Sequence, residues 1–191
     1  NYGSSNIGNS AIMTTSGQDV CRTFTQQNSS STVYASFLVK VSAAQTGDYI
    51  FAFAPSASNA NYRARTFVKA SSNSGFINFG ISNSGTANYN STPTDYAINT
   101  THLVVVKYTF TSATTATATV FINPNTSSEP TTSEVSFTDN TGANAPADIN
   151  SFTIRQGSNT AAPTLVMDGI RIATNWGALM GNPQYNSSTN I

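Results

Sequence analysis

Charged residues are scarce in this chain. Lys, Arg, Asp and Glu make up 8% of its 191 residues, against roughly a quarter in an ordinary globular domain, and the formal net charge is zero. No basic stripe is available to neutralise phosphates, so the sequence argues against nucleic-acid binding. A neutral surface also lacks the mutual repulsion that keeps proteins apart in solution. The composition therefore leaves self-association electrostatically unopposed.

Long hydrophobic runs are absent as well, since no apolar segment approaches the ~20 residues that a helix needs to span a bilayer. We expect no membrane insertion. Asn, Ser and Thr make up about two-fifths of the chain and supply the polarity that charges normally would. The chain opens on Asn1-Tyr2-Gly3 without a signal peptide, as a processed mature protein does. These features predict a secreted, extracellular or cell-surface protein.

Groups suited to catalysis are few. The one cysteine, Cys21, lies in a segment that alternates like a strand, and free cysteines are often buried, so we predict a buried, inert thiol. The one histidine, His102, begins a strand, where a capping or rim role is commoner than that of a base. No predicted strand carries the two carboxylates on one face that glycoside hydrolysis requires. The sequence therefore predicts no catalytic residue, and a protein that is not an enzyme.

Alternation of apolar and polar residues is the strongest pattern in the chain. The stretch THLVVVKYTFTSATTATATVFINP, residues 101–124, places Val104, Val106 and Tyr108 on one side of an extended chain. A short polar link divides the stretch, which predicts a long antiparallel hairpin whose apolar face needs a second sheet to cover it. Further strands are predicted over 11–15, 19–25, 33–41, 48–54, 62–70, 76–82, 96–98, 134–137, 151–156 and 165–173.

About a dozen strands without a helix longer than one turn predict an all-β protein. The expected architecture is a two-sheet antiparallel jelly-roll sandwich that forms a single domain over residues 1–191, with its core over about 11–176. Residues 1–10 and 177–191 are polar and lack periodicity. We interpret them as an N-terminal arm and a C-terminal tail.

Several segments, in order, resemble one family of secreted domains. They are SFLVKVSAAQTGDYIFAF, RARTFVK, GFINFGIS, YAINTTHLVVVKYTF, VFINP, FTIRQG and LVMDGIRIATNW. Together they are similar to the laminin-G-like, concanavalin A-like jelly rolls of surface proteins from Bacteroidetes-type bacteria, over residues ~19 to ~176. The resemblance implies two large sheets, with a ligand site often on the concave one. Members include lectins, glycan-binding modules, glycoside hydrolases and adhesive domains, so the fold does not choose among these functions.

Two functions fit these observations. The first is a non-catalytic structural protein that assembles with itself into an extracellular filament or matrix, through sheet edges and terminal arms. Candidate arm residues for such a homopolymer are Asn1, Tyr2, Tyr185 and Ile191. The alternative is a carbohydrate-binding or adhesive, lectin-like module whose partners are glycans.

Candidate glycan-binding residues lie at three positions. Arg63 and Arg65 share a predicted strand face with Phe67, an arrangement that could grip a carboxylated sugar. Paired charges on a solvated strand face are the commoner explanation. Trp176 could stack on a sugar, as could several tyrosines, although large rings more often fill the core of such a sandwich.

A calcium site is the one cofactor site that the sequence suggests. Asp139, Asn140 and Asp148 offer oxygen ligands around a turn glycine, and calcium prefers such ligands. The spacing does not match an EF-hand, and Asp-Asn-Thr-Gly is also an ordinary turn signature. No other cofactor is expected.

Overall fold

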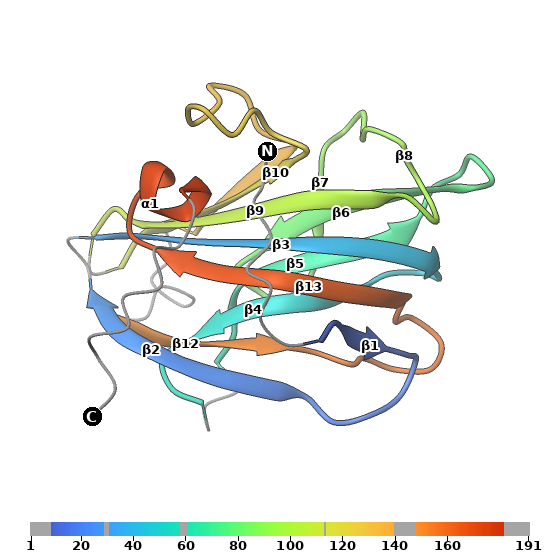
Figure 1. Ribbon diagram of the computed structural model, residues 1–191, viewed down its shortest axis with the longest axis horizontal. Helices are drawn as coiled ribbons and strands as arrows, with labels where there is room; N and C mark the ends of the chain where they lie inside the picture. The colour runs from blue at the N-terminus through green and yellow to red at the C-terminus, as the bar shows by residue number, and fades with distance from the viewer. Residues whose placement is uncertain (1–8, 29–30, 58–60, 113, 140–147, 182–191) are drawn as a thin grey trace.

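The computed structural model describes residues 9–28, 31–57, 61–112, 114–139 and 148–181, and it confirms the predicted two-sheet sandwich (Figure 1). Neighbouring strands run antiparallel in both sheets. The six-stranded sheet has the order β1 (Ala11–Met13), β13 (Thr164–Ala173), β3 (Thr32–Ala43), β9 (Thr101–Phe110), β10 (Ala116–Ile122) and β11 (Val135–Asp139). The seven-stranded sheet has the order β2 (Val20–Asn28), β12 (Asp148–Ile154), β4 (Asp48–Ala54), β5 (Arg63–Ala70), β6 (Phe76–Ser82) and β7 (Asn88–Tyr89), and β8 (Tyr96–Ala97) also pairs with β6.

The predicted hairpin is formed by β9 and β10. Their register pairs Phe110 with Ala116 and Val104 with Ile122, so the hairpin is seven pairs long. The face that alternation assigned to the core is buried, with Val104, Val106 and Tyr108 fully inaccessible to solvent. The prediction is confirmed because a period of two over ten residues leaves only one way to bury a continuous apolar face.

Aromatic rings join the two sheets across the core. Phe37 of the six-stranded sheet lies against Phe51 of the other sheet, with ring centroids 5.1 Å apart. Phe51 also stacks on Phe152 of β12 at 5.7 Å and meets Phe53 edge-on at 5.3 Å. Each fully buried ring of this size contributes about 1.5–3 kcal/mol to folding, so this group stabilises the packing of one layer on the other.

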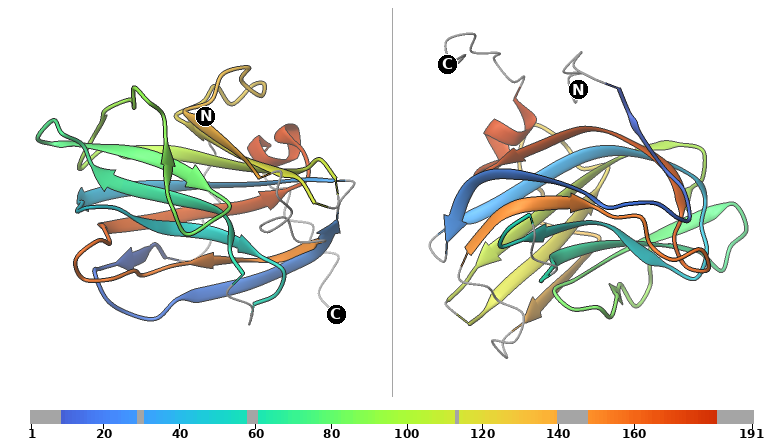
Figure 2. Two further views of the ribbon diagram at one scale, coloured as in Figure 1. Left: turned by 180° about the vertical axis from the view of Figure 1, so that it is seen from behind. Right: turned by 90° about the horizontal axis from the view of Figure 1, so that it is seen from below.

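A short helix, α1 (Trp176–Met180), lies on part of the outer face of the six-stranded sheet (Figure 2). Its N-cap is Asn175, whose Oδ1 accepts a hydrogen bond from the Ala178 amide at 2.8 Å. Capping of this kind satisfies an amide that the first turn leaves unpaired. The helix therefore occupies the start of the segment that the sequence predicted to be an aperiodic tail.

The side of the hairpin away from the core is consequently not free. Leu103, Val105 and Phe121 pack under α1 in a second apolar cluster, together with Tyr34 and Leu179. The alternation of residues in the hairpin does not predict which element packs against this face. A five-residue helix is too short to show a helical period, which is why the sequence did not predict it.

Cys21 departs from its prediction. It lies on β2, the edge strand of the seven-stranded sheet, and the residue is exposed, with Sγ 3.2 Å from the Ala57 carbonyl oxygen. The prediction of a buried thiol is wrong because an edge strand is covered on one side only. Within the described part of the chain, no helix is long and apolar enough to cross a bilayer.

Candidate functional site

The outer face of the seven-stranded sheet carries a line of rings. Residues paired across antiparallel strands share a face, and Tyr49 pairs with Phe67, Phe67 with Gly80, and Gly80 with Tyr89. The residues that alternate with this line along β5 and β6 lie in the core. The line therefore runs across β4, β5, β6 and β7 on the outer surface, and no helix among the described residues covers it.

Tyr49 is the centre of a compact group on this face. Two guanidinium groups lie near its ring, that of Arg155 at 4.1 Å and that of Arg65 at 5.3 Å from the centroid. Two further rings meet it edge-on, Phe67 at 5.5 Å and Tyr62 at 5.9 Å. We call these five residues the tyrosine–arginine strip. Except for Phe67, which is buried, each is partly exposed.

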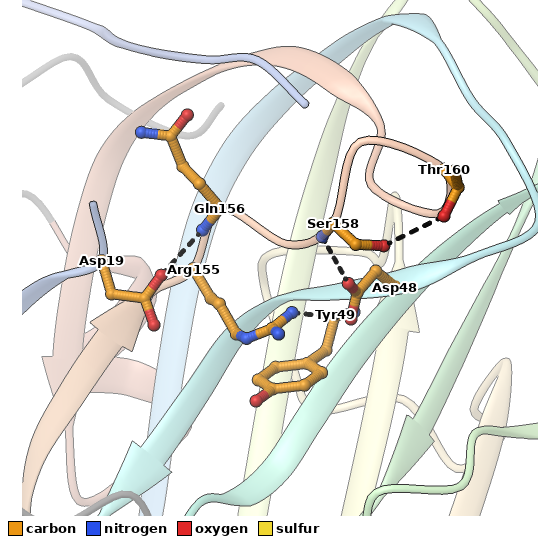
Figure 3. Close-up of polar contacts among 7 residues, drawn as sticks. All are labelled: Asp19, Asp48, Tyr49, Arg155, Gln156, Ser158 and Thr160. Carbon is orange, nitrogen blue, oxygen red and sulfur yellow. Dashed lines mark hydrogen bonds and ion pairs between the residues drawn. The ribbon is translucent and has the colours of Figure 1, made fainter. Parts of the chain in front are cut away.

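Asp48 fixes the position of Arg155 (Figure 3). Its Oδ1 accepts a hydrogen bond from Arg155 Nη1 at 2.7 Å, and its Oδ2 accepts one from the Ser158 amide at 3.3 Å. A Cβ at Gly157 would lie 1.9 Å from the same Oδ2, so only glycine lets the backbone approach the carboxylate this closely. Burial lowers the pKa of Arg155, but the hydrogen bond to Asp48 and the electrostatic effects of Tyr49, Asp48 and Asp19 together outweigh it, and the pKa is raised. Arg155 is therefore a rigid cation that is already paired.

Lys69 and Tyr89 extend the strip along β5 and β7. Lys69 Nζ lies 4.2 Å from the centroid of the Tyr89 ring, a cation–π distance. Gly80 makes room for that ring, because a Cβ there would come within 2.8 Å of it. The glycine at this position therefore leaves space for the ring of a tyrosine from β7 against β6.

Arg65 differs from Arg155 in its partners. Its guanidinium lies 6.0 Å from the centroid of Tyr62 as well as near Tyr49, but none of the described carboxylates forms an ion pair with it. Its Nε is buried and donates to no described residue. A buried donor without an acceptor costs about 1–3 kcal/mol. The residue as a whole is partly exposed and has no carboxylate partner among the described residues, so its guanidinium can still donate to a ligand.

Arg63 does not join Arg65, contrary to prediction. A β-bulge lies between them, where Ala64 has a positive φ of 46°. Arg63 consequently pairs with the core residue Phe53 and is only 2% exposed. Its guanidinium donates to the Tyr62 carbonyl at 2.8 Å, and burial lowers its pKa. Strict alternation placed both arginines on one face, and the bulge breaks that alternation.

Trp176 is likewise not presented to a ligand. It is 7% exposed and lies edge-on to Tyr34 at 6.2 Å and to Phe121 at 5.7 Å. These contacts anchor α1 to the six-stranded sheet. The tryptophan therefore has a packing role, and it lies on the opposite side of the sandwich from the strip.

The predicted calcium ligands are only partly described. Asp139 is buried at the end of β11, whereas Asp148 begins β12 in the other sheet and accepts a hydrogen bond from Gln26 Nε2 at 2.7 Å. Asn140 lies outside the described residues. Among those that are described, no three His, Cys, Asp or Glu side chains gather as a metal site would require. The calcium site stays a prediction.

His102 is held inside a polar cluster at the opposite end of β9 from its hairpin link. It is 4% exposed, and its Nε2 lies 2.9 Å from the Ala97 carbonyl oxygen, which can only accept, so Nε2 carries a proton. Its Nδ1 lies 3.1 Å from the Asn123 amide nitrogen, whose Oδ1 is already bonded to the Leu103 amide. Nδ1 therefore accepts, and both ring nitrogens serve the structure.

Two cations of this face, Lys69 and Arg155, were not predicted from the sequence as site residues. Lys69 continues the alternation that Arg65 and Phe67 begin on β5. Arg155 follows Ser151 and Thr153 at the same spacing beyond β12. Alternation could have found both, but nothing in a single sequence says that β12 lies beside β4.

Comparison with known proteins identifies the fold. No family model matches the sequence, and no curated protein matches it either. A native heptameric SAP-like pentraxin from Limulus polyphemus has a similar structure, with a TM-score of 0.54 and 14% identity over 84% of this chain and 74% of that one. The sandwich has the concanavalin A-like jelly-roll fold.

Two further solved structures are similar to this chain over most of its length. One is a homodimeric agglutinin from chicken liver, with a TM-score of 0.42 and 10% identity over 82% of this chain and 100% of that one. The other is an endo-β-1,4-glucuronan lyase from the fungus Trichoderma reesei, with a TM-score of 0.48 and 11% identity over 96% of this chain and 82% of that one.

The lyase corrects one expectation. The sequence predicted that this protein is not an enzyme, but the structures similar to this chain include a lyase, so that exclusion is wrong. The prediction rested on a single chemistry, hydrolysis by two carboxylates. The absence of such a pair says nothing about reactions that do not use one.

Proposed function

We propose that this protein binds carbohydrate through the tyrosine–arginine strip. The observation that carries the proposal is the line of rings from Tyr49 to Tyr89, partly exposed at both ends with the buried Phe67 between them. It crosses four strands on an outer face without a covering helix among the described residues. Neighbouring strands lie about 4.8 Å apart, so the line is roughly 14 Å long. That length accommodates more than one sugar ring.

The chemistry of the strip suits a sugar. One side of a pyranose presents C–H groups that pack on an aromatic ring, and its hydroxyls need donors and acceptors at the ring edges. Tyr49 and Tyr62 offer an apolar ring with a polar tip, and the guanidinium of Arg65 offers several donors in a plane. The contacts around Tyr49 hold these groups in place before a ligand arrives, which lowers the entropy cost of binding.

A glycan array followed by isothermal titration calorimetry tests the proposal. We expect the protein to bind a subset of glycans, and Tyr62→Ala to weaken that binding at least tenfold because a stacking ring is lost. Lys40→Gln is the matched control, since Lys40 is exposed on β3 of the other sheet and should be neutral. A protein that binds no glycan on the array, or a Tyr62→Ala variant that binds normally, would refute the assignment.

The homopolymer favoured first by the sequence has less support. Its candidate arm residues, Asn1, Tyr2, Tyr185 and Ile191, lie outside the described residues. It therefore stays a prediction, as do the secreted location and the kinship with laminin-G-like domains of bacterial surface proteins. Negative-stain microscopy at high protein concentration distinguishes filaments from uniform particles.

A further inference from the structure

The outer face that carries the tyrosine–arginine strip has an excess of positive charge. Three cations lie on it, Arg65, Lys69 and Arg155, although the whole chain has a net charge of zero. Of these, Arg155 is paired with Asp48. Neither Arg65 nor Lys69 has a carboxylate within ion-pair distance among the described residues. The free charge of the face is therefore concentrated on β5.

Arg65 and Lys69 are spaced along one strand. They lie four residues apart on the same side of β5, with Phe67 between them, so their Cα atoms are about 13 Å apart at the usual rise per residue. Tyr49 and Tyr62 lie beside the Arg65 guanidinium, and Tyr89 lies beside Lys69 Nζ. Each unpaired cation thus has a ring next to it, and the two pairs repeat along the strand.

We infer that the ligand of this face is an acidic glycan, one that carries carboxylate or sulfate groups. This inference rests on the proposed function and names its ligand class. A carboxylate or sulfate presents two oxygens that match the planar guanidinium of Arg65, which is partly exposed and has no ion-pair partner among the described residues. A neutral sugar covering the face would instead take two cations out of water without supplying a counter-charge, which is unfavourable. The repeated cation–ring pairs fit a polymer with charges at regular intervals.

Two matched pairs of polymers test the inference by titration calorimetry. One pair is polygalacturonate and its carboxyl-reduced, neutral form, and the other is dextran sulfate and dextran. We expect at least one acidic polymer to bind ten or more times tighter than its neutral partner, and the pair that does so distinguishes carboxylate from sulfate. The affinity should fall when NaCl is raised from about 0.05 to 0.5 M, because salt screens exposed charges.

Variants assign the effect to the face. Arg65→Gln should weaken the binding of the acidic polymer at least tenfold, and Lys69→Gln should weaken it less. Arg65→Lys should bind with an affinity between those of the wild type and Arg65→Gln, because lysine keeps the positive charge but lacks the planar donors of the guanidinium. Lys40→Gln, on the other sheet, should change nothing. Circular dichroism confirms that each variant is folded, and if Arg65→Gln is not, Arg65→Lys and Lys69→Gln carry the test.

The outcomes separate the two proposals. Equal affinity for the acidic and neutral members of both pairs, or tighter binding of neutral glycans, would overturn the acidic ligand and keep carbohydrate binding. Binding of acidic polymers that Lys40→Gln weakens as much as Arg65→Gln would show non-specific charge attraction and overturn the site. A protein that binds neither polymer pair nor any glycan on an array would overturn carbohydrate binding itself.

Discussion

Replacing Trp176 by alanine should destabilise the sandwich and leave glycan binding unchanged. The indole lies edge-on to Tyr34 and Phe121 under α1, and the residue is 7% exposed. Truncating a buried tryptophan to alanine costs about 3–5 kcal/mol, depending on how far the cavity closes. Here α1 lies on the surface and can settle into the gap, and the indole Nε1 has no described hydrogen bond to lose. We therefore expect a loss in the free energy of unfolding near the lower limit, about 3 kcal/mol.

Urea unfolding followed by circular dichroism measures this change. For a chain of this size, a loss of about 3 kcal/mol lowers the melting temperature by roughly 6–12 °C. Trp176→Phe is the control, because it keeps a ring against both partners and should cost about 1–2 kcal/mol. The reasoning fails if Trp176→Ala abolishes glycan binding while stability is unchanged, since the tryptophan would then contact the ligand.

Three further predictions follow from single contacts. Gly80→Ala should destabilise the fold by about 1–3 kcal/mol and weaken glycan binding, because the added methyl group would collide with the Tyr89 ring. A urea titration that shows unaltered stability would contradict this prediction. Asp95 accepts three side-chain hydrogen bonds that hold its pKa below the usual value, so Asp95→Asn should be destabilising at pH 7. That difference should shrink as pH falls below about 4, the unfolded pKa, and vanish below the folded one, as urea midpoints across pH would reveal. Cys21 should react with a thiol reagent in the native protein as fast as after unfolding, and protection in the native state would show that it is covered.

The layers of this fold were predictable because alternation over long strands is a strong signal. The hairpin of β9 and β10 contains seventeen strand residues in two runs of period two, and only one register buries Val104, Val106 and Val120 together. Helix α1 was not predictable in this way. Its five residues make little more than one turn, and its stability comes from the sheet beneath it rather than from its own sequence.

The candidate site was predictable only in part from the sequence. One β-bulge explains why Arg63 does not lie where the sequence predicted. Arg63 and Arg65 are two residues apart, so alternation places them together, but the positive φ of Ala64 turns Arg63 toward the core. A bulge adds a residue to one strand only, and its position depends on the partner strand. The sequence of β5 therefore could not show that one arginine is buried and the other is at the surface.

Scarcity of charge in the sequence did not predict scarcity of charge at the site. The chain has eight Lys and Arg residues, and three of them lie on the outer face of the seven-stranded sheet, from β5 and from the loop after β12. These segments are far apart in the chain and meet only because β4 pairs with both strands. Of these three cations only Arg155 forms an ion pair with a described carboxylate, that of Asp48, so most of the positive charge is unpaired. The local field of a sheet face is thus set by strand order, which net charge and composition do not report.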